Sequence, residues 1–163
     1  MLVITHRRLE DVLASACRLV IAYVDLYFDK KQVNTAIVIQ NIIKRTVDLI
    51  DTMIGCHVKF RREYPNTSHF DIQYDDLVAQ PIETVRRLYN RFGLAWSNEF
   101  ETAMLAWLRN NPQGKQGRNP YALSDYGIIL DDITLRYKDY ISMFLNPQPS
   151  SHTEENTTKS EAE

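Results

Sequence analysis

The segment that decides the fold covers residues 2–15, which read LVITHRRLEDVLAS. It opens with three apolar residues, two of them β-branched, and these predict a short buried strand. A polar cluster from Thr5 to Arg8 ends the strand, and an apolar pattern typical of a helix begins at Leu9. Basic residues therefore stand where a strand is followed by a helix, and ligands of open α/β sheets bind at such a place.

Two side chains of this segment suit an anionic ligand. The guanidinium of Arg7 offers a planar set of donors that matches phosphate. Ser15, in the first turns of the helix, can add a hydroxyl donor. A basic turn with a hydroxyl on a solvated helix face is the alternative, and the segment alone favours it. The decision depends on the other motifs of the chain.

Composition excludes several classes of partner. A chain of 163 residues suits one domain with a sizeable core, and 44% hydrophobic with 25% charged residues is ordinary for a globular protein. The net charge of -2 gives no general attraction to nucleic acid, so an anion site must be local. The sequence has no run of eighteen apolar residues and no signal-peptide pattern, so we predict no membrane span and a cytoplasmic location.

The residue pattern gives no evidence for a metal site or for a catalytic residue. The four histidines are scattered, with no cysteine at ligand spacing, so we predict no metal site. Cys17 and Cys56 lie in apolar helical patterns and are interpreted as small core residues in a reducing compartment. We assign no catalytic residue, because the adjacent carboxylates at 75–76 and 131–132 are interpreted as solvated.

Hydrophobic periodicity predicts a helix-rich α/β chain. Leu2–Thr5 and Phe70–Tyr74 are expected to form neighbouring parallel strands, joined by a crossover of two long helices over residues 9–28 and 31–60. Residues 1–145 are assigned to the domain, and the polar composition of 146–163 predicts a disordered tail. Further helices are expected from Pro81 to Gly93, from Ser97 to Asn110, and from Ser124 onward.

The second long helix carries an apolar stripe that two arrangements explain. The stripe consists of Ile39, Ile43, Val47, Ile50 and Ile54. It serves either as the seam of a homodimer or as the face that packs on the chain's own sheet, and the pattern favours the second. We expect these residues to be mostly buried.

A loop rich in glycine and basic residues follows the fourth predicted helix. It reads Gly-Lys-Gln-Gly-Arg over residues 114–118. Backbone amides and cationic side chains in such a loop are able to surround an anion, although most loops of this composition bind nothing.

The blocks identified above stand in a particular order. They are Thr-His-Arg at 5–7 with Ser15, Tyr-Asp-Asp-Leu at 74–77 with Pro81, and the 114–118 loop with Tyr121 and Asp-Tyr-Gly at 125–127. In this order the chain resembles the C-terminal portion of the sulfotransferase family, whose members use 3′-phosphoadenosine 5′-phosphosulfate (PAPS). It is most similar to the bacterial and invertebrate group with blocks of the type HRDP…S, Y-x-DL-x-x-P and GKxGxxxY. The resemblance covers residues 1 to about 144.

The resemblance implies a fold, a co-substrate and a set of binding residues. The fold would be a partial sulfotransferase domain related to P-loop NTPases, with a small parallel sheet that lacks the N-terminal P-loop strand. Arg7 and Ser15 would bind the 3′-phosphate of PAPS, and Tyr74 would contact the adenine. Lys115, Gly117 and Arg118 would close over the same phosphate. In the full-length form a sulfuryl group would pass from PAPS to a hydroxyl or amine of an unknown small-molecule, glycan or lipid acceptor.

The chain departs from the family pattern in ways that keep an alternative open. Arg8 and Leu9 replace the usual Asp-Pro, and no glycine-rich 5′-phosphosulfate loop or upstream catalytic base is found. We therefore expect either a short gene product or the C-terminal part of a longer one, with no sulfotransferase turnover by these 163 residues alone. A non-catalytic nucleotide-binding or helical interaction module of the same fold is the alternative.

Overall fold

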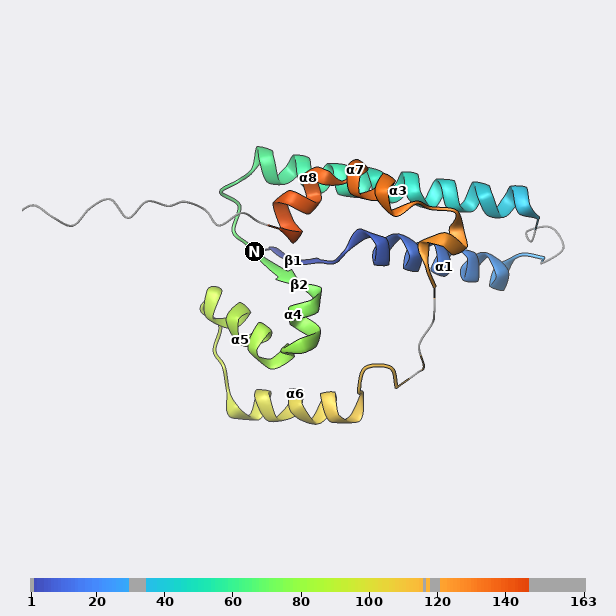
Figure 1. The fold of residues 1–163 in the computed structure, drawn as a ribbon. Helices are drawn as coiled ribbons and strands as arrows, with labels where there is room; N and C mark the ends of the chain where they lie inside the picture. The colour runs from blue at the N-terminus through green and yellow to red at the C-terminus, as the bar shows by residue number, and fades with distance from the viewer. Residues whose placement is uncertain (1, 30–34, 116, 118–120, 147–163) are drawn as a thin grey trace, which may run out of the picture.

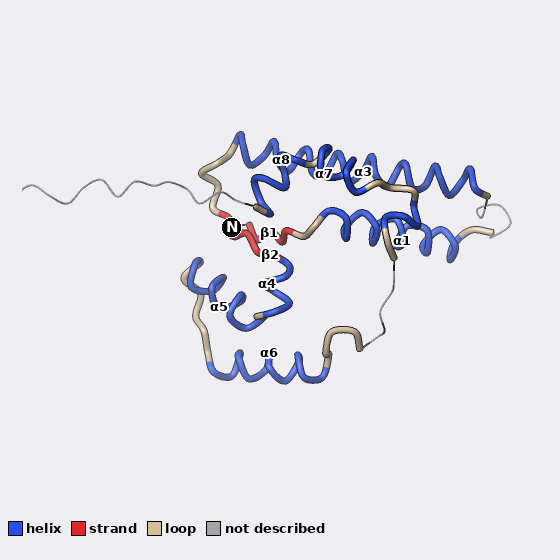
Figure 2. The backbone as a smooth tube through the Cα atoms, in the orientation of Figure 1, coloured by secondary structure: helices blue, strands red, loops and turns tan. Residues whose placement is uncertain are grey.

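Two parallel strands connect the parts of the chain in the computed structural model (Figure 1), which describes residues 2–29, 35–115, 117 and 121–146. Strand β1 (Leu2–His6) pairs with β2 (His69–Gln73), in a register that runs from Leu2 opposite His69 to His6 opposite Gln73. Figure 2 shows the pair in red between two groups of helices. The predicted parallel neighbours, joined through helices, are confirmed.

The crossover consists of two long helices that lie side by side. Helix α1 (Leu9–Tyr27) leads away from β1, and α3 (Ala36–Glu63) returns toward β2 (Figure 1). The hydroxyl of Thr35 caps α3 by accepting a hydrogen bond from the Val38 amide. Both predicted helices are confirmed, and residues 31–34 of the expected second helix lie outside the described part.

Three further helices follow β2, on the side of the sheet away from α3. They are α4 (Tyr74–Ala79), α5 (Pro81–Arg91) and α6 (Asn98–Asn110). Pro81 begins α5, and Gly93, at φ +63°, follows its end in a conformation that favours glycine. Ser97 caps α6 through a 3.1 Å hydrogen bond from the Phe100 amide, as predicted. Helix α4 was not expected, and Tyr74 opens it instead of ending β2.

The prediction of a last helix capped by Ser124 is wrong. Ser124 lies inside a short 3-10 turn, η1 (Leu123–Tyr126), which begins after Ala122. The Asp125 carboxylate accepts the Ala122 amide at 2.8 Å, and Gly127 ends the turn at φ +67°. The chain then forms α7 (Leu130–Arg136), α8 (Lys138–Tyr140) and the π-helical turn η2 (Ile141–Leu145). The expected tail, apart from Asn146, lies outside the described residues.

The core lies where α1, α3 and the C-terminal helices meet. Its buried members are Leu9, Leu13, Val58, Ile133, Tyr137, Tyr140 and Phe144. The residues of the α3 stripe are half-buried, and Val47, Ile50 and Ile54 pack against this core. The outer side of α3 exposes Ile37, Leu49 and Met53. Packing within the chain therefore accounts for Val47, Ile50 and Ile54 of the stripe. A homodimer through this helix stays a prediction. None of the helices in the described ranges is long and apolar enough to cross a membrane.

Two leucines of α1 test which face of this helix packs against the core. Leu13 is 1% exposed and Leu19 is 70% exposed. We expect Leu13→Ala to lower the free energy of unfolding by about 2–5 kcal/mol, because it leaves a cavity in the core. The matched change Leu19→Ala should cost less than about 0.5 kcal/mol. Urea unfolding followed by circular dichroism measures both, and equal losses would show that α1 packs through a different face.

Candidate functional site

The carboxyl ends of the two strands form one edge of the sheet. His6 is paired with Gln73, so Arg7 and Tyr74 are the next residues along the two chains. The guanidinium carbon of Arg7 lies 4.4 Å from the centre of the Tyr74 ring, which is a cation–π contact. The fold thus brings together two site residues that are 67 positions apart in the sequence.

A cavity of about 400 Å³ opens at this edge. Its polar wall comes from the ends of β1 and β2, and its apolar wall comes from α7 and η2. The lining residues are His6, Arg7, Arg8, Glu10, Gln73, Tyr74, Asp75, Leu130, Thr134, Ile141, Leu145 and Asn146. This volume falls in the range of small-molecule sites.

The side chain of Arg7, which lines this cavity, has an unsatisfied donor. Its Nε atom is buried, and among the described residues no acceptor forms a hydrogen bond with it. The nearest carboxylate oxygen, from Asp11, is 3.6 Å away and so makes an ion pair without a hydrogen bond. A buried donor without a partner is costly, and an anion that supplies an acceptor would relieve that cost. The residues present therefore fit an anionic group.

Ser15 lies further along the same side of α1. Residues four apart share one face of a helix, so Asp11 stands between Arg7 and Ser15. The Asp11 carboxylate also accepts a 3.4 Å hydrogen bond from Arg8, which is paired with Glu10 as well. An anion that reaches Arg7 and Ser15 therefore has to compete with Asp11.

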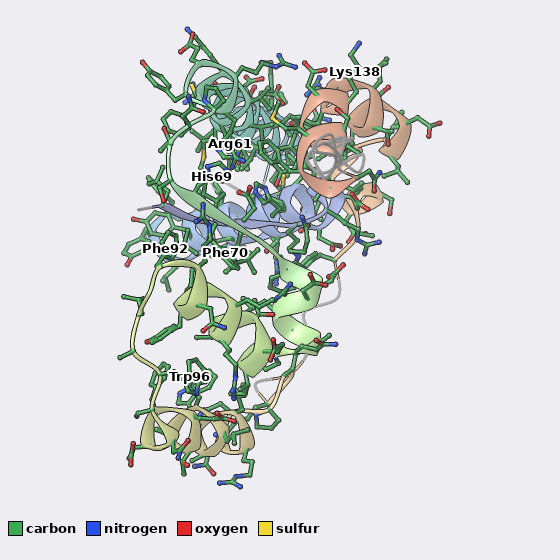
Figure 3. The ribbon with its side chains drawn as sticks, turned by 90° about the vertical axis from the view of Figure 1, so that its left-hand side faces the viewer. Arg61, His69, Phe70, Phe92, Trp96 and Lys138 are labelled. Carbon is green, nitrogen blue, oxygen red and sulfur yellow. The ribbon has the colours of Figure 1, made fainter. Side chains whose placement is uncertain are left out.

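The glycine-rich loop lies at the end of α6 and not at the strand edge. Lys115 donates a hydrogen bond of 2.6 Å to the carbonyl of Asn110, and the Gly117 amide donates to the Gly114 carbonyl at 2.9 Å. Figures 1 and 3 both place α6 beyond α4 and α5 from the sheet. Within the described part of the chain, no contact joins Lys115 or Gly117 to Arg7 or Ser15. Arg118 lies outside that part.

Comparison with known proteins identifies the family. Residues 1–98 match the model of the sulfotransferase family. The chain belongs to this family. Among solved structures it is similar to a sulfotransferase from Mycobacterium avium, with a TM-score of 0.72 and 19% sequence identity. The match covers 85% of this chain and 34% of that one, so the chain spans about a third of the length of that sulfotransferase. The search of curated proteins finds no match.

Sequence reasoning missed a polar network behind the carboxyl edge of the sheet in this sulfotransferase-family chain. The ring of His6 is 1% exposed and is bonded at both nitrogens. Its Nε2 lies 2.9 Å from Asp71 Oδ1, and its Nδ1 lies 3.1 Å from the hydroxyl of Tyr140. The ring stacks on Phe144 with centroids 4.4 Å apart. Asp71 also binds Arg61 through both carboxylate oxygens, at 2.7 and 2.9 Å.

The two faces of the sheet explain where this network lies. Polar His69, Asp71 and Gln73 alternate along β2 with Phe70 and Ile72. Figure 3 shows Arg61 and His69 on the α3 side, and Phe70 with Phe92 on the α5 side. The alternation was visible in the sequence and could have indicated a polar face, but its partners from α3 and α8 could not be read there.

Charge and burial act in opposite directions within the network. Burial alone raises the pKa of Asp71, but the hydrogen bonds and positive charge of Arg61 and His6 outweigh it and hold this pKa at about 2. Burial lowers the pKa of His57, and nearby His6 and Arg61 lower it further. The Nε2 atom of His57 is buried with no hydrogen-bond partner in the described structure. No group of side chains suited to a metal ion occurs among the described residues.

The depressed pKa of His57 predicts a pH dependence of stability. Below the ordinary histidine pKa of 6.5 the unfolded chain takes up a proton at this residue, while the folded chain resists it. The free energy of unfolding should therefore fall as the pH is lowered from 7 toward 5. His57→Phe keeps a ring against Phe144 and removes the titration, so its curve should be flatter over this range. Urea titrations at several pH values measure the slope, and equal slopes would contradict the assignment.

Proposed function

We propose that this chain binds the 3′-phosphate end of a PAPS-type nucleotide at the carboxyl edge of the β1–β2 sheet. The observation that carries the proposal is the Arg7 guanidinium, which lies against Tyr74 with a buried Nε that has no acceptor in the described structure. A phosphate oxygen would satisfy this donor, and charge-assisted bonds of this type are among the strongest available.

The other roles that the family resemblance implies are part of the same proposal. Tyr74 lines the same cavity and presents an aromatic ring for the adenine. Ser15 would donate its hydroxyl to the phosphate from the second turn of α1. Lys115, Gly117 and Arg118 would complete the site if their loop approaches it. Gly114 and Gly117 have φ values of +80° and +90°, which glycine adopts without strain and which allow the loop backbone to bend sharply.

The reaction of the whole protein is part of the same proposal. When bound, PAPS supplies an activated sulfuryl group, which would pass to a hydroxyl or amine of an acceptor. The chain spans 34% of the Mycobacterium avium sulfotransferase. We assign to the present residues the binding and orientation of the nucleotide, and no catalytic group.

A non-catalytic nucleotide-binding or helical interaction module is the second candidate. It is favoured by the charge balance at the strand edge, where Glu10 and Asp11 are paired with Arg7 and Arg8. Such a balance weakens the general attraction for an anion and leaves only specific hydrogen bonds to hold it. Binding without transfer by a protein that contains the complete family domain would favour this module.

Replacement of Arg7 tests whether it recognises the 3′-phosphate. We expect Arg7→Ala to weaken binding of adenosine 3′,5′-bisphosphate by about 2 kcal/mol, or about thirtyfold, because a charge-assisted hydrogen bond is lost. Binding of adenosine 5′-monophosphate, which lacks the 3′-phosphate, should hardly change. Isothermal titration calorimetry measures both affinities.

The matched control for this experiment is Arg8→Ala. Arg8 has a side chain that is 62% exposed and is paired with Asp11, as Arg7 is, and with Glu10, so its loss changes the local charge equally. We expect less than a threefold effect, the scale of a surface ion pair. Equal effects of the two variants on both nucleotides would show that local charge, and not Arg7 itself, determines binding.

A second pair of variants tests the loop. Lys115→Ala should reduce the affinity for adenosine 3′,5′-bisphosphate by about fivefold to tenfold if the loop reaches the phosphate. Arg109→Ala removes an exposed cation from the end of α6 and serves as the control. Calorimetry that gives unchanged affinity for Lys115→Ala would remove Lys115 from the site and leave Arg7 in it.

A further inference from the structure

The C-terminal segment of the fold is bonded to both strand ends that carry the proposed site. The hydroxyl of Tyr140, on α8, lies 3.1 Å from His6 Nδ1, at the end of β1. The carbonyl of Phe144, on η2, accepts a 2.6 Å hydrogen bond from the side chain of Gln73, at the end of β2. Arg7 and Tyr74 are the residues that directly follow these two anchored positions. The C-terminal segment therefore controls where both strands end.

Tyr140 is buried beside the end of β1. Burial raises the pKa of its hydroxyl. The residue is 5% exposed, so water does not compete strongly for its hydrogen bond with His6. This hydroxyl thus contacts the side chain of the residue that directly precedes Arg7.

The ionised carboxylate of Asp71 fixes the direction of one hydrogen bond in the network. Asp71 only accepts, so His6 Nε2 donates to it. His6 Nδ1 and the Tyr140 hydroxyl form the second hydrogen bond of the ring. Arg61, 13% exposed, holds Asp71 through two bonds and completes the chain of contacts.

We propose that Tyr140, acting through His6, is a positioning residue that sets the Arg7 guanidinium for the 3′-phosphate. It does not touch the nucleotide. The inference rests on the proposed function for its binding readout, but the placement of Arg7 over Tyr74 can be measured without any ligand.

The test compares Tyr140→Phe with Tyr137→Phe in the 163-residue chain. Each variant removes one hydroxyl from a buried tyrosine of the same core and keeps the ring. The Tyr137 hydroxyl donates to Asp51 and has no hydrogen bond with His6 or Arg7 within the described residues. The readout is the ratio of affinities for adenosine 3′,5′-bisphosphate and adenosine 5′-monophosphate, measured by calorimetry.

We expect Tyr140→Phe to lower this ratio about fivefold, the effect of one hydrogen bond, and Tyr137→Phe to leave it unchanged. A structural role alone would reduce both affinities together and would not move the ratio. Asp71→Asn, which weakens the hold on His6 from the other side, should lower the ratio in the same direction. An unchanged ratio for Tyr140→Phe, or an equal fall for Tyr137→Phe, would overturn the proposal.

A second readout separates this inference from the proposed function. In the free chain the Tyr74 ring should shift the NMR signals of the Arg7 side chain, and Tyr140→Phe should reduce that shift while Tyr137→Phe preserves it. If the wild-type chain does not discriminate between the nucleotides, the proposed function fails and the NMR comparison alone decides the positioning role. Loss of the ring-current shift in both variants, or in neither, would overturn the proposal.

Discussion

The burial of His6 is the constraint on which the arrangement of this structure depends. An imidazole that is 1% exposed must find partners for both ring nitrogens, because a buried polar group without a hydrogen bond costs free energy of the order of 1–3 kcal/mol. Asp71 from β2 and Tyr140 from α8 supply them. The single ring therefore joins three parts of the chain, and the stacked Phe144 closes its remaining face. The parallel pair of strands is too small to fix its own position, and this polar contact adds to the packing of the helices around it.

The same constraint explains the charges around the sheet. The carboxylate of Asp71 is 29% exposed, and the guanidinium of Arg61, which is 13% exposed, neutralises it with two hydrogen bonds. The second amino group of Arg61 also lies 2.6 Å from His69 Nε2, which ties α3 to the start of β2. Because the members satisfy one another, removal of one leaves an uncompensated polar group and costs more than the pair itself contributes.

Much of the fold could be predicted from local patterns, and the network could not. The β-branched run before His6, the apolar periods of α1 and α3 and the cap at Ser97 each lie within a few residues, so their signals are local. His6 is 65 positions from Asp71 and 134 positions from Tyr140 in the sequence, and no hydrophobic period links these residues. Helix α4 was missed because Tyr74 continues the alternation of β2, and the turn at Ser124 was misread because Asp125, not Ser124, makes the capping bond.

The predicted site likewise contains one part that the sequence could predict and one part that it could not. Arg7 and Tyr74 meet because each directly follows one of two paired strands, and this was foreseeable once the strands were recognised as parallel. The position of the glycine-rich loop depends on how α6 lies against α5, through the contact of Tyr89 with Phe100 and the ion pair of Arg86 with Glu101. These are tertiary contacts between helices, which composition does not specify.

Asp11 occupies the side of Arg7 that an anion would approach at this edge of the sheet. Its carboxylate lies 3.6 Å from Arg7 Nε, and both side chains are 33% exposed, so the ion pair contributes little to stability. A phosphate offers more oxygen acceptors and more charge than a carboxylate, and is able to approach the guanidinium with two parallel bonds. In the proposed nucleotide site, a phosphate would therefore displace Asp11 from Arg7. Asp11 and the Tyr74 ring keep Arg7 at the strand edge, so little side-chain freedom would be lost on binding of the anion.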